Sequence, residues 1–315
     1  MSSRSAILCP VDFSDPSRGA LRYARVIADH FGSRLVVLAV EDPLLTEAVD
    51  LGTGVVWDPE DTRHELAHFA AGALGGNPQR KTDVEYEVAV GQPAKQILHV
   101  AQENACDLIV MSTHGLTGMR KMFFGSTTER VLRETAIPVL ATPASGPEPD
   151  SVEDIRRAVG RILVPVDITG GSLRQVQVAR GLSEALHVPI IVTHVVEPVR
   201  SPLAAKLHLP NIELERRTRA EDALAELLAT VPRQLHAEAL VAFGDPAEEI
   251  AKIARDRTAG LTVIGLHAST AGGPRMGSVT YRVLCLATSL VLALPPQVVA
   301  GADGSGPEIH GFVHK

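Results

Sequence analysis

Two stretches of the chain, Ala6-Ile-Leu-Cys-Pro-Val-Asp12 and Arg161-Ile-Leu-Val-Pro-Val-Asp167, are versions of one segment, an apolar run that ends in Pro-Val-Asp. They lie 155 positions apart. Further along, Gly91-Gln-Pro-Ala-Lys-Gln-Ile97 matches Gly244-Asp-Pro-Ala-Glu-Glu-Ile250, and Gly125-Ser-Thr matches Gly277-Ser-Val, at spacings of 153 and 152 residues. Because the three pairs recur in the same order, the sequence predicts one module written twice.

Within each copy, short apolar runs alternate with longer amphipathic ones, which is typical of βαβ units around a mostly parallel sheet. Ser14 can cap the first helix, with Pro16 just inside its start and Gly32 just beyond its end. The predicted fold class is therefore α/β, with two tandem modules that each hold an open five-stranded sheet flanked by helices. In the first copy we expect strands at 5–11, 34–40, 84–90, 107–112 and 137–142, and helices near 15–31, 58–75, 93–104 and 126–135. In the second copy we expect strands at 161–166, 188–195, 236–242, 261–265 and 289–294.

The chain has 315 residues, more than the roughly 100 to 200 residues of one ordinary core, so two domains are expected. The stretch Pro143-Ala-Ser-Gly-Pro-Glu-Pro-Asp150 is rich in proline and acidic residues and has little to bury. We predict a first domain over 1–145, a linker over 146–159, a second domain over 160–297 and a flexible tail over 298–315.

Composition excludes several classes of protein. A formal net charge of -7 and a pI near 5.9 argue against a nucleic-acid partner, which would require a concentrated basic face. Cys9, Cys106 and Cys285 sit in apolar runs without metal-ligand spacing, so we expect buried thiols in a reducing compartment. No uninterrupted apolar stretch reaches the ~18 to 20 residues of a membrane-spanning helix. We therefore expect a cytoplasmic protein with no membrane partner.

The stretch from Leu108 to Glu129, LIVMSTHGLTGMRKMFFGSTTE, runs from a strand through a loop into a helix start. Small residues at Ser112 and Gly115 let the backbone approach a ligand, and the residues from Gly125 to Thr128 offer backbone N–H groups at a helix N-terminus, which favour an anion. Arg120 and Lys121 lie in the loop, where they can meet phosphate charge. Ligands of open α/β sheets sit beyond the carboxyl ends of the strands, the edge to which Asp12 also belongs.

At these residues the chain resembles the universal stress protein family, and because both halves match it resembles a tandem member. The resemblance implies a Rossmann-like fold, similar to that of the adenine-nucleotide alpha hydrolases. ATP-binding members carry Gly, two residues, Gly, nine residues, Gly-Ser/Thr. Here Ser112-Thr-His-Gly115, nine residues, Gly125-Ser126 keeps that spacing, with Ser for the first Gly. The resemblance implies adenine and ribose contacts at Pro10, Asp12 and Val40, and phosphate contacts at Met111, Ser112, His114, Gly115, Gly125, Ser126, Thr127 and Thr128.

The second copy departs further from this pattern. Gly265-Leu-His-Ala268, eight residues, Gly277-Ser278 lacks the second Gly and is one residue shorter, and Arg275 is the cation of its loop. An alanine at 268 costs on the order of 1 kcal/mol or more if that position needs a positive φ. We expect a weaker second nucleotide site. Its members by position are Pro165, Asp167, Val195, Gly265, His267, Gly277, Ser278, Val279 and Thr280.

Simpler interpretations stay open for several of these residues. Asp12 and Asp167 can act as helix-capping or turn residues, and His114 and His267 can brace their loops by hydrogen bonds without a catalytic role. His64-Glu-Leu-Ala-His68 has the H-E-x-x-H spacing of zinc peptidases. No clear third ligand follows it and the second copy has no equivalent, so we interpret it as a chance string.

The sequence contains no Walker A motif and no Gly-x-Gly-x-x-Gly fingerprint, and we predict neither a catalytic residue set nor a metal site. The resemblance implies a stress-linked ATP-binding module in which Mg²⁺ is held mainly by the phosphates. A weak Mg²⁺-dependent ATPase and an ATP-free interaction protein are the alternatives. The apolar runs Ile137 to Ala141 and Leu290 to Leu294 are expected to form edge strands. We predict that they pair within the chain, which imitates a dimer of single modules and leaves room for further homodimerisation.

Overall fold

The computed structural model describes residues 5–43, 58–75, 82–113, 125–168, 171–198, 210–266 and 276–296. These residues divide into two compact units, with the boundary between Ile155 and Arg156. The units are called the first and the second domain below, and each is described by itself. The tail predicted at 298–315 lies outside the described residues.

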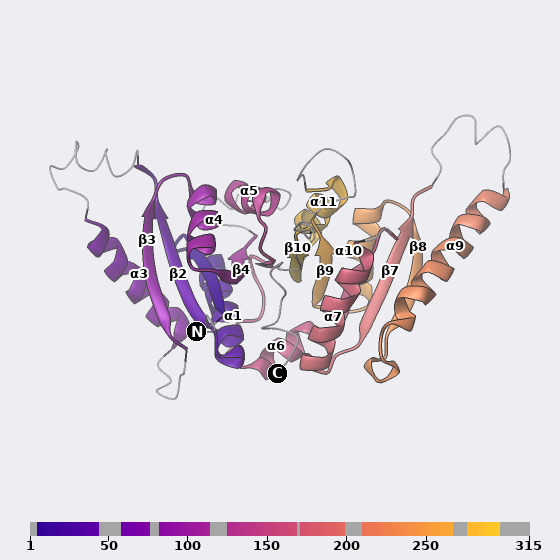
Figure 1. The fold of residues 1–315 in the computed structure, drawn as a ribbon, viewed down its shortest axis with the longest axis horizontal. Helices are drawn as coiled ribbons and strands as arrows, with labels where there is room; N and C mark the ends of the chain where they lie inside the picture. Colours follow the sequence, from indigo (N-terminus) through magenta and orange to yellow (C-terminus); the bar gives the residue numbers. More distant parts are fainter. Residues whose placement is uncertain are drawn as a thin grey trace, which may run out of the picture. The chain divides into compact units, whose positions relative to one another are not determined.

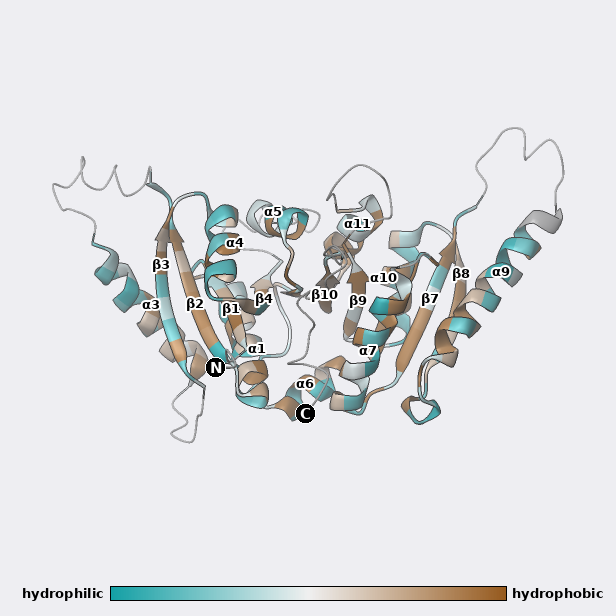
Figure 2. Ribbon diagram, viewed as in Figure 1, coloured by the Kyte–Doolittle hydropathy of each residue, from teal (hydrophilic) through white to brown (hydrophobic). Residues whose placement is uncertain are grey.

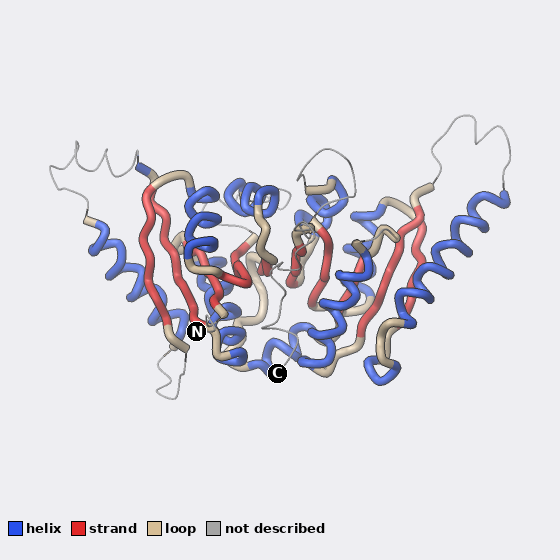
Figure 3. The backbone as a smooth tube through the Cα atoms, viewed as in Figure 1, coloured by secondary structure: helices blue, strands red, loops and turns tan. Residues whose placement is uncertain are grey.

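The first domain is a parallel five-stranded sheet with helices on both faces (Figures 1 and 3). Its strands stand in the order β3-β2-β1-β4-β5, and all their pairings are parallel. Helices α1 and α3 pack on each other and on the sheet, and α4 packs on α5 and on the sheet. The strands are β1 (Ala6–Val11), β2 (Arg34–Glu41), β3 (Val84–Val90), β4 (Cys106–Ser112) and β5 (Val139–Thr142), and the helices are α1 (Asp15–Phe31), α3 (Pro59–Leu74), α4 (Pro93–Glu103) and α5 (Ser126–Glu134).

The second domain repeats this architecture, with strand order β10-β9-β6-β7-β8 and parallel pairings. Its helix α7 packs on α9, and α10 packs on α11. The strands are β6 (Ile162–Pro165), β7 (Ile190–Val196), β8 (Glu238–Phe243), β9 (Leu261–Gly265) and β10 (Leu290–Leu294). The helices are α7 (Ser172–Leu186), α9 (Pro210–Ala229), α10 (Pro246–Asp256) and α11 (Ser278–Leu286), with a short 3₁₀ turn, η1 (Arg233–Leu235). The predicted class is confirmed. The strand bounds of both domains and the helix bounds of the first domain lie within two residues of their expected places.

Most strands of both sheets are mainly hydrophobic (Figure 2). All six residues of β1 are buried, because helices cover both faces of the sheet. Helix α1 begins as predicted, with the Ser14 side chain accepting a hydrogen bond from the backbone N–H of Ser17. It ends at Gly32, whose φ of 65° places the backbone in the left-handed region that favours glycine.

One helix lies in the segment predicted as a linker, namely α6 (Val152–Val159). Ser151 and Asp154 form a capping box, in which each side chain accepts a hydrogen bond from the backbone N–H of the other residue. The preceding residues are attached to α1. The guanidinium of Arg25, 5% exposed, donates to the carbonyl of Pro149 and to Asp150, both at 3.3 Å. The end of the first domain is therefore held by ion pairs although its sequence has few apolar residues to bury.

The duplication extends to the backbone conformation. Positive φ angles recur at equivalent positions of the two domains: Phe13 (61°) and Ile168 (59°), Gly32 (65°) and His187 (54°), Gly91 (144°) and Gly244 (145°), and Ala105 (48°) and Thr258 (50°). Most of these residues have a side chain, for which the left-handed region costs roughly 1–2 kcal/mol. The two domains therefore share turns that are retained even where glycine is not.

The two central strands of each sheet separate toward their carboxyl ends. In the first domain β1 pairs with β2 through Val11, but its pairing with β4 ends at Leu8 and Ile109. In the second domain the pairing of β6 with β9 ends at Leu163 and Thr262. In both sheets the earlier strands of the domain lie on one side of this place and the later strands lie on the other. Open α/β sheets bind ligands at such a switch point of the strand order.

Candidate functional site

The residues proposed for the first site gather at the carboxyl edge of the first sheet. Pro10 and Val40 lie near the ends of β1 and β2, Met111 and Ser112 end β4, and Asp12 follows β1. Gly125 is the N-cap of α5, and the first turn of that helix holds Ser126, Thr127 and Thr128. His114, Gly115, Arg120 and Lys121 lie outside the described residues.

The N-terminus of α5 is anchored to the end of β4. The backbone N–H of Gly125 donates to the carbonyl of Thr113 at 3.0 Å, and the Thr128 hydroxyl donates to the carbonyl of Ser112, also at 3.0 Å. A Cβ atom at Gly125 would lie in ordinary van der Waals contact with the Thr113 carbonyl oxygen, at 3.4 Å. The ends of the loop 114–124 are thereby held together. The Thr128 hydroxyl points into the domain, so a phosphate contact by Thr128 would use its backbone N–H.

The first turn of α5 has the features of an anion site. Gly125 supplies no side-chain cap, and the N–H groups of the first turn of a helix have no partner within the helix. The positive end of the helix dipole points the same way, so a phosphate at this place is stabilised by charge and by hydrogen bonds. This N-terminus lies next to the end of β4, beside the place where β1 and β4 separate.

Asp12 shapes the turn between β1 and α1. Its Oδ1 accepts hydrogen bonds from the backbone N–H and the hydroxyl of Ser14, and Phe13 between them has a φ of 61°. The turn role that was left open for Asp12 is therefore present. The Asp12 carboxylate is thereby held in place at the start of the turn that follows β1.

The second domain has the same anchors at its own carboxyl edge. Gly277 donates to the carbonyl of Leu266 at 3.0 Å, and the Thr280 hydroxyl donates to the carbonyl of Gly265 at 2.9 Å. Asp167 accepts a hydrogen bond from the Ser172 hydroxyl at 3.2 Å. Pro165, Val195, Ser278 and Val279 occupy the expected places on β6, β7 and α11, whereas His267, Ala268 and Arg275 lie outside the described residues.

The sequence pattern of the universal stress protein family matches residues 4–143 and 158–295, one match for each domain. The chain belongs to the universal stress protein family. Universal stress protein YxiE of Bacillus subtilis is 30% identical over 142 residues, which are 42% of this chain and 95% of that protein. A universal stress protein of Methanocaldococcus jannaschii is 26% identical over 148 residues, which are 42% of this chain and 91% of that protein.

Solved structures share the tandem architecture. A Pseudomonas aeruginosa protein described as functionally unknown has a TM-score of 0.61 at 20% identity, and the match covers 93% of each chain. A universal stress protein from Archaeoglobus fulgidus has a TM-score of 0.59 at 18% identity, covering 92% of this chain and 96% of that one. These likenesses show the fold. A shorter universal stress protein, 24% identical over 46% of this chain, has been solved in complex with cAMP.

Sequence reasoning missed one residue at the second candidate site of this universal stress protein. Gln175, in the first turns of α7, is 8% exposed, and its side-chain amide donates to the carbonyl of Pro165 at 3.1 Å. The signal was present as a polar residue on the buried face of an amphipathic helix, at the position where the first copy has Ala20.

The other candidate features of this universal stress protein lie away from these edges. His64 and His68 of α3 are exposed, and no group of three His, Cys, Asp or Glu side chains suited to a metal occurs among the described residues. Burial raises the pKa of the Cys9 thiol, and it raises the pKa of Cys106 to about 12. Within the described part of the chain, no helix is long and apolar enough to span a membrane.

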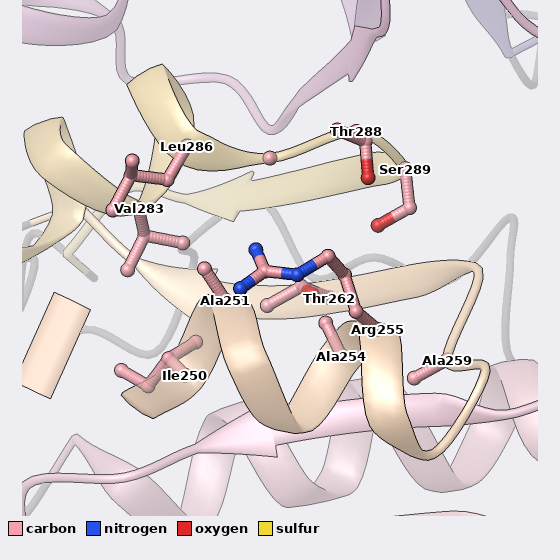
Figure 4. Close-up of a pocket in the computed structure, with 11 residues that line it drawn as sticks. Ile250, Ala251, Ala254, Arg255, Ala259, Thr262, Val283, Leu286, Thr288 and Ser289 are labelled. Carbon is pink, nitrogen blue, oxygen red and sulfur yellow. The ribbon is translucent and has the colours of Figure 1, made fainter. Parts of the chain in front are cut away.

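A small pocket of about 40 Å³ lies between α10, α11 and the amino ends of β9 and β10 (Figure 4). Its wall is mainly aliphatic, with the hydroxyl groups of Thr262, Thr288 and Ser289 and the guanidinium of Arg255 added. Gly265 and Gly277 lie at the opposite edge of the same sheet, so this pocket is separate from the second phosphate-type loop.

Proposed function

We propose that the first domain of this universal stress protein binds ATP in the crevice between β1 and β4. The observation that carries the proposal is the anchored N-terminus of α5, which presents backbone N–H groups beside the point where the two central strands separate. A phosphate group suits this end of a helix, and a nucleotide suits a crevice at a switch point of the strand order.

In this proposal the base and the ribose lie over the ends of β1 and β2, against Pro10 and Val40, with Asp12 accepting their hydrogen bonds. The phosphates lie at Met111, Ser112 and the first turn of α5. From the loop, His114, Gly115 and Arg120 would add to the phosphate site, and any Mg²⁺ would be held mainly by the phosphates. Judged by the sequence pattern alone, the second domain would provide the weaker site of the two.

We infer that the bound nucleotide serves as a signal in the stress response, without a dedicated catalytic residue set. A nucleotide can act as a signal only if it binds two states of the protein with different affinity. Slow hydrolysis is the alternative. It would appear as Mg²⁺-dependent phosphate release that is lost in Asp12→Ala, whereas a binding module releases no phosphate above the buffer rate.

The proposed effect of the nucleotide on the protein involves the edges of the sheets of the two domains. Strands β5 and β10 are the terminal strands of their own sheets. An open edge is stabilised by pairing, and we propose that the two edges pair within one chain. Light scattering gives the mass and X-ray scattering gives the shape. A compact monomer or a compact dimer supports intramolecular pairing, and an extended chain with separated domains would contradict it.

Native mass spectrometry of freshly purified protein tests ATP binding. We expect an adenine nucleotide to be carried through purification by the wild-type chain and to be absent from Asp12→Ala. The matched control is Asp107→Ala, because Asp107 is an exposed aspartate in the amino-terminal half of β4, away from the proposed site. If the wild type carries no nucleotide and shows no calorimetric response to ATP, the proposed function is wrong and the ATP-free interaction protein is favoured.

A further inference from the structure

The crevice of the second domain holds a side chain of the protein itself. The pairing of β6 with β9 ends at Leu163 and Thr262, and Pro165 and Gly265 are the last residues of the two diverging strands. The side-chain amide of Gln175 donates to the carbonyl of Pro165 at 3.1 Å. A Cβ atom added at Gly265 would lie 3.5 Å from the nitrogen of the same amide. Gln175 therefore reaches from α7 into the opening between the ends of both strands.

This amide is well fixed in place. The Gln175 side chain is 8% exposed, so it is packed rather than extended into solvent. The preceding residue is also attached to a strand end, because the guanidinium of Arg174 donates to the carbonyl of Pro295, directly after β10. Two consecutive side chains of α7 thus tie this helix to the carboxyl edge of the second sheet.

The first domain differs at the same two helix positions. The residues 155 positions earlier are Gly19 and Ala20, which have no polar side chain. Ala20 is fully buried, and a Cβ at Gly19 would meet nothing within 4 Å. The first domain therefore has no side chain that could reach from these positions of α1 to the end of β1.

A second difference complements the first one. The last residue of β4 is Ser112, whereas the equivalent last residue of β9 is Gly265. The first domain combines the small Ala20 of the helix with Ser112 of the strand. The second domain combines the long Gln175 of the helix with Gly265 of the strand. Gly265 keeps the first glycine of the ATP-binding pattern, but the space beside it is occupied by the Gln175 amide.

We propose that Gln175 closes the nucleotide crevice of the second domain, so that the chain binds one nucleotide, in the first domain. This inference rests on the proposed function of the first domain. Gln175 acts as a specificity-determining residue, because it fills the opening between β6 and β9 that a ribose or phosphate would otherwise enter. The second domain is thereby a closed copy of the site rather than a weaker open one.

The experiment measures the number of nucleotides per chain by native mass spectrometry, with calorimetric titration of ATP on the nucleotide-free protein. We expect one nucleotide per wild-type chain and two per Gln175→Ala chain. Gln175→Leu keeps the side-chain volume without the amide and is expected to remain at one. Gln177→Ala is the matched control, since Gln177 is an exposed glutamine on the same helix. Gln175→Ser serves as a second opening variant if the alanine variant does not fold.

The outcomes separate this inference from the proposed function. Two nucleotides on the wild-type chain would overturn the closure and leave the proposed function standing. One nucleotide on the wild type and still one on the folded Gln175→Ala and Gln175→Ser chains would also overturn the closure. A wild-type chain without nucleotide contradicts the proposed function, and a gain of one nucleotide on Gln175→Ala would then still support closure of the second crevice.

Discussion

Thr128→Val removes one hydrogen bond that joins the first turn of α5 to the end of β4. The Thr128 side chain is 5% exposed, and its hydroxyl lies 3.0 Å from the carbonyl oxygen of Ser112. Valine has nearly the same shape, so the substitution leaves no cavity. A neutral hydrogen bond contributes about 1 kcal/mol, and a buried group left without its partner costs about 1–3 kcal/mol. We therefore expect the free energy of unfolding of the first domain to fall by about 1–2 kcal/mol.

Calorimetry of the nucleotide-free protein measures this loss. In a domain of about 150 residues, each kcal/mol lowers the midpoint temperature by about 2–4 °C. Thr280→Val removes the equivalent bond from the second domain and is expected to have a similar effect on that domain. Because the helix N-terminus is also the proposed phosphate site, Thr128→Val is expected to weaken ATP binding several-fold in addition.

Thr128→Ser is the control, because it retains the hydroxyl and is expected to keep most of the nucleotide affinity. A Thr128→Val chain that unfolds at the wild-type temperature would refute the assigned contribution of the hydrogen bond. Wild-type ATP affinity in a measurably destabilised Thr128→Val chain would refute the link between this anchor and the phosphate site.

Three further tests of the fold use five substitutions, two of them as controls. Gly91→Ala is expected to cost about 1–3 kcal/mol, because its φ of 144° is a backbone conformation that residues with a side chain rarely adopt. Gly19→Ala, in open space within α1, should stabilise the fold by about 0.5–1 kcal/mol, and urea unfolding measures both effects. Arg25→Met is expected to lower the free energy of unfolding by about 2 kcal/mol and to expose the segment 148–150 to proteolysis. The control is Arg180→Met, which removes an exposed i,i+4 ion pair and should lower the free energy of unfolding by less than about 0.5 kcal/mol. Asp245→Asn should lower the free energy of unfolding at pH 7 but not at acid pH, and urea unfolding as a function of pH measures this. A hydrogen bond from the Arg282 guanidinium holds the pKa of the Asp245 carboxyl below its usual range. The contribution of the carboxylate is therefore present above about pH 4 and is lost as the pH falls through the folded pKa.

Each of these tests has an outcome that contradicts its reasoning. Equal effects of the two glycine substitutions would show that the positive φ at Gly91 has no cost. Unchanged protease resistance in Arg25→Met would show that the segment 148–150 is held by other contacts. A stability difference for Asp245→Asn that persists at pH 2 would mean that the carboxylate charge is not its source.

Much of the fold was predictable because its signals are local. Ser14, Pro16 and Gly32 mark the ends of α1, and the apolar runs mark strands that are buried on both faces. The repeat then placed the second set of strands. Helix α6 was not predicted from the sequence, because proline and acidic residues precede it and suggested a linker. Ser151 and Asp154 nevertheless carried a capping signal.

The site was predictable only in part, since motif spacing places residues at an edge without showing what their side chains contact. The inward hydroxyl of Thr128 depends on a distance between two separate elements, α5 and β4. The positive φ of Phe13 could not be expected from a bulky side chain, because local preference disfavours that conformation. Gln175 was overlooked because its partner, the Pro165 carbonyl, is a backbone group that no sequence motif reports.

The matched positive φ angles make each domain a template for engineering the other. The two domains place different residues at turns with the same backbone conformation. A residue found at such a turn in one domain is therefore compatible with the equivalent turn of the other. His187 holds a left-handed φ of 54° where the first domain has Gly32. Transfer of glycine to that position is expected to relieve about 1 kcal/mol of backbone strain. A chain that contains its own homologue can thus be stabilised by exchange between its halves.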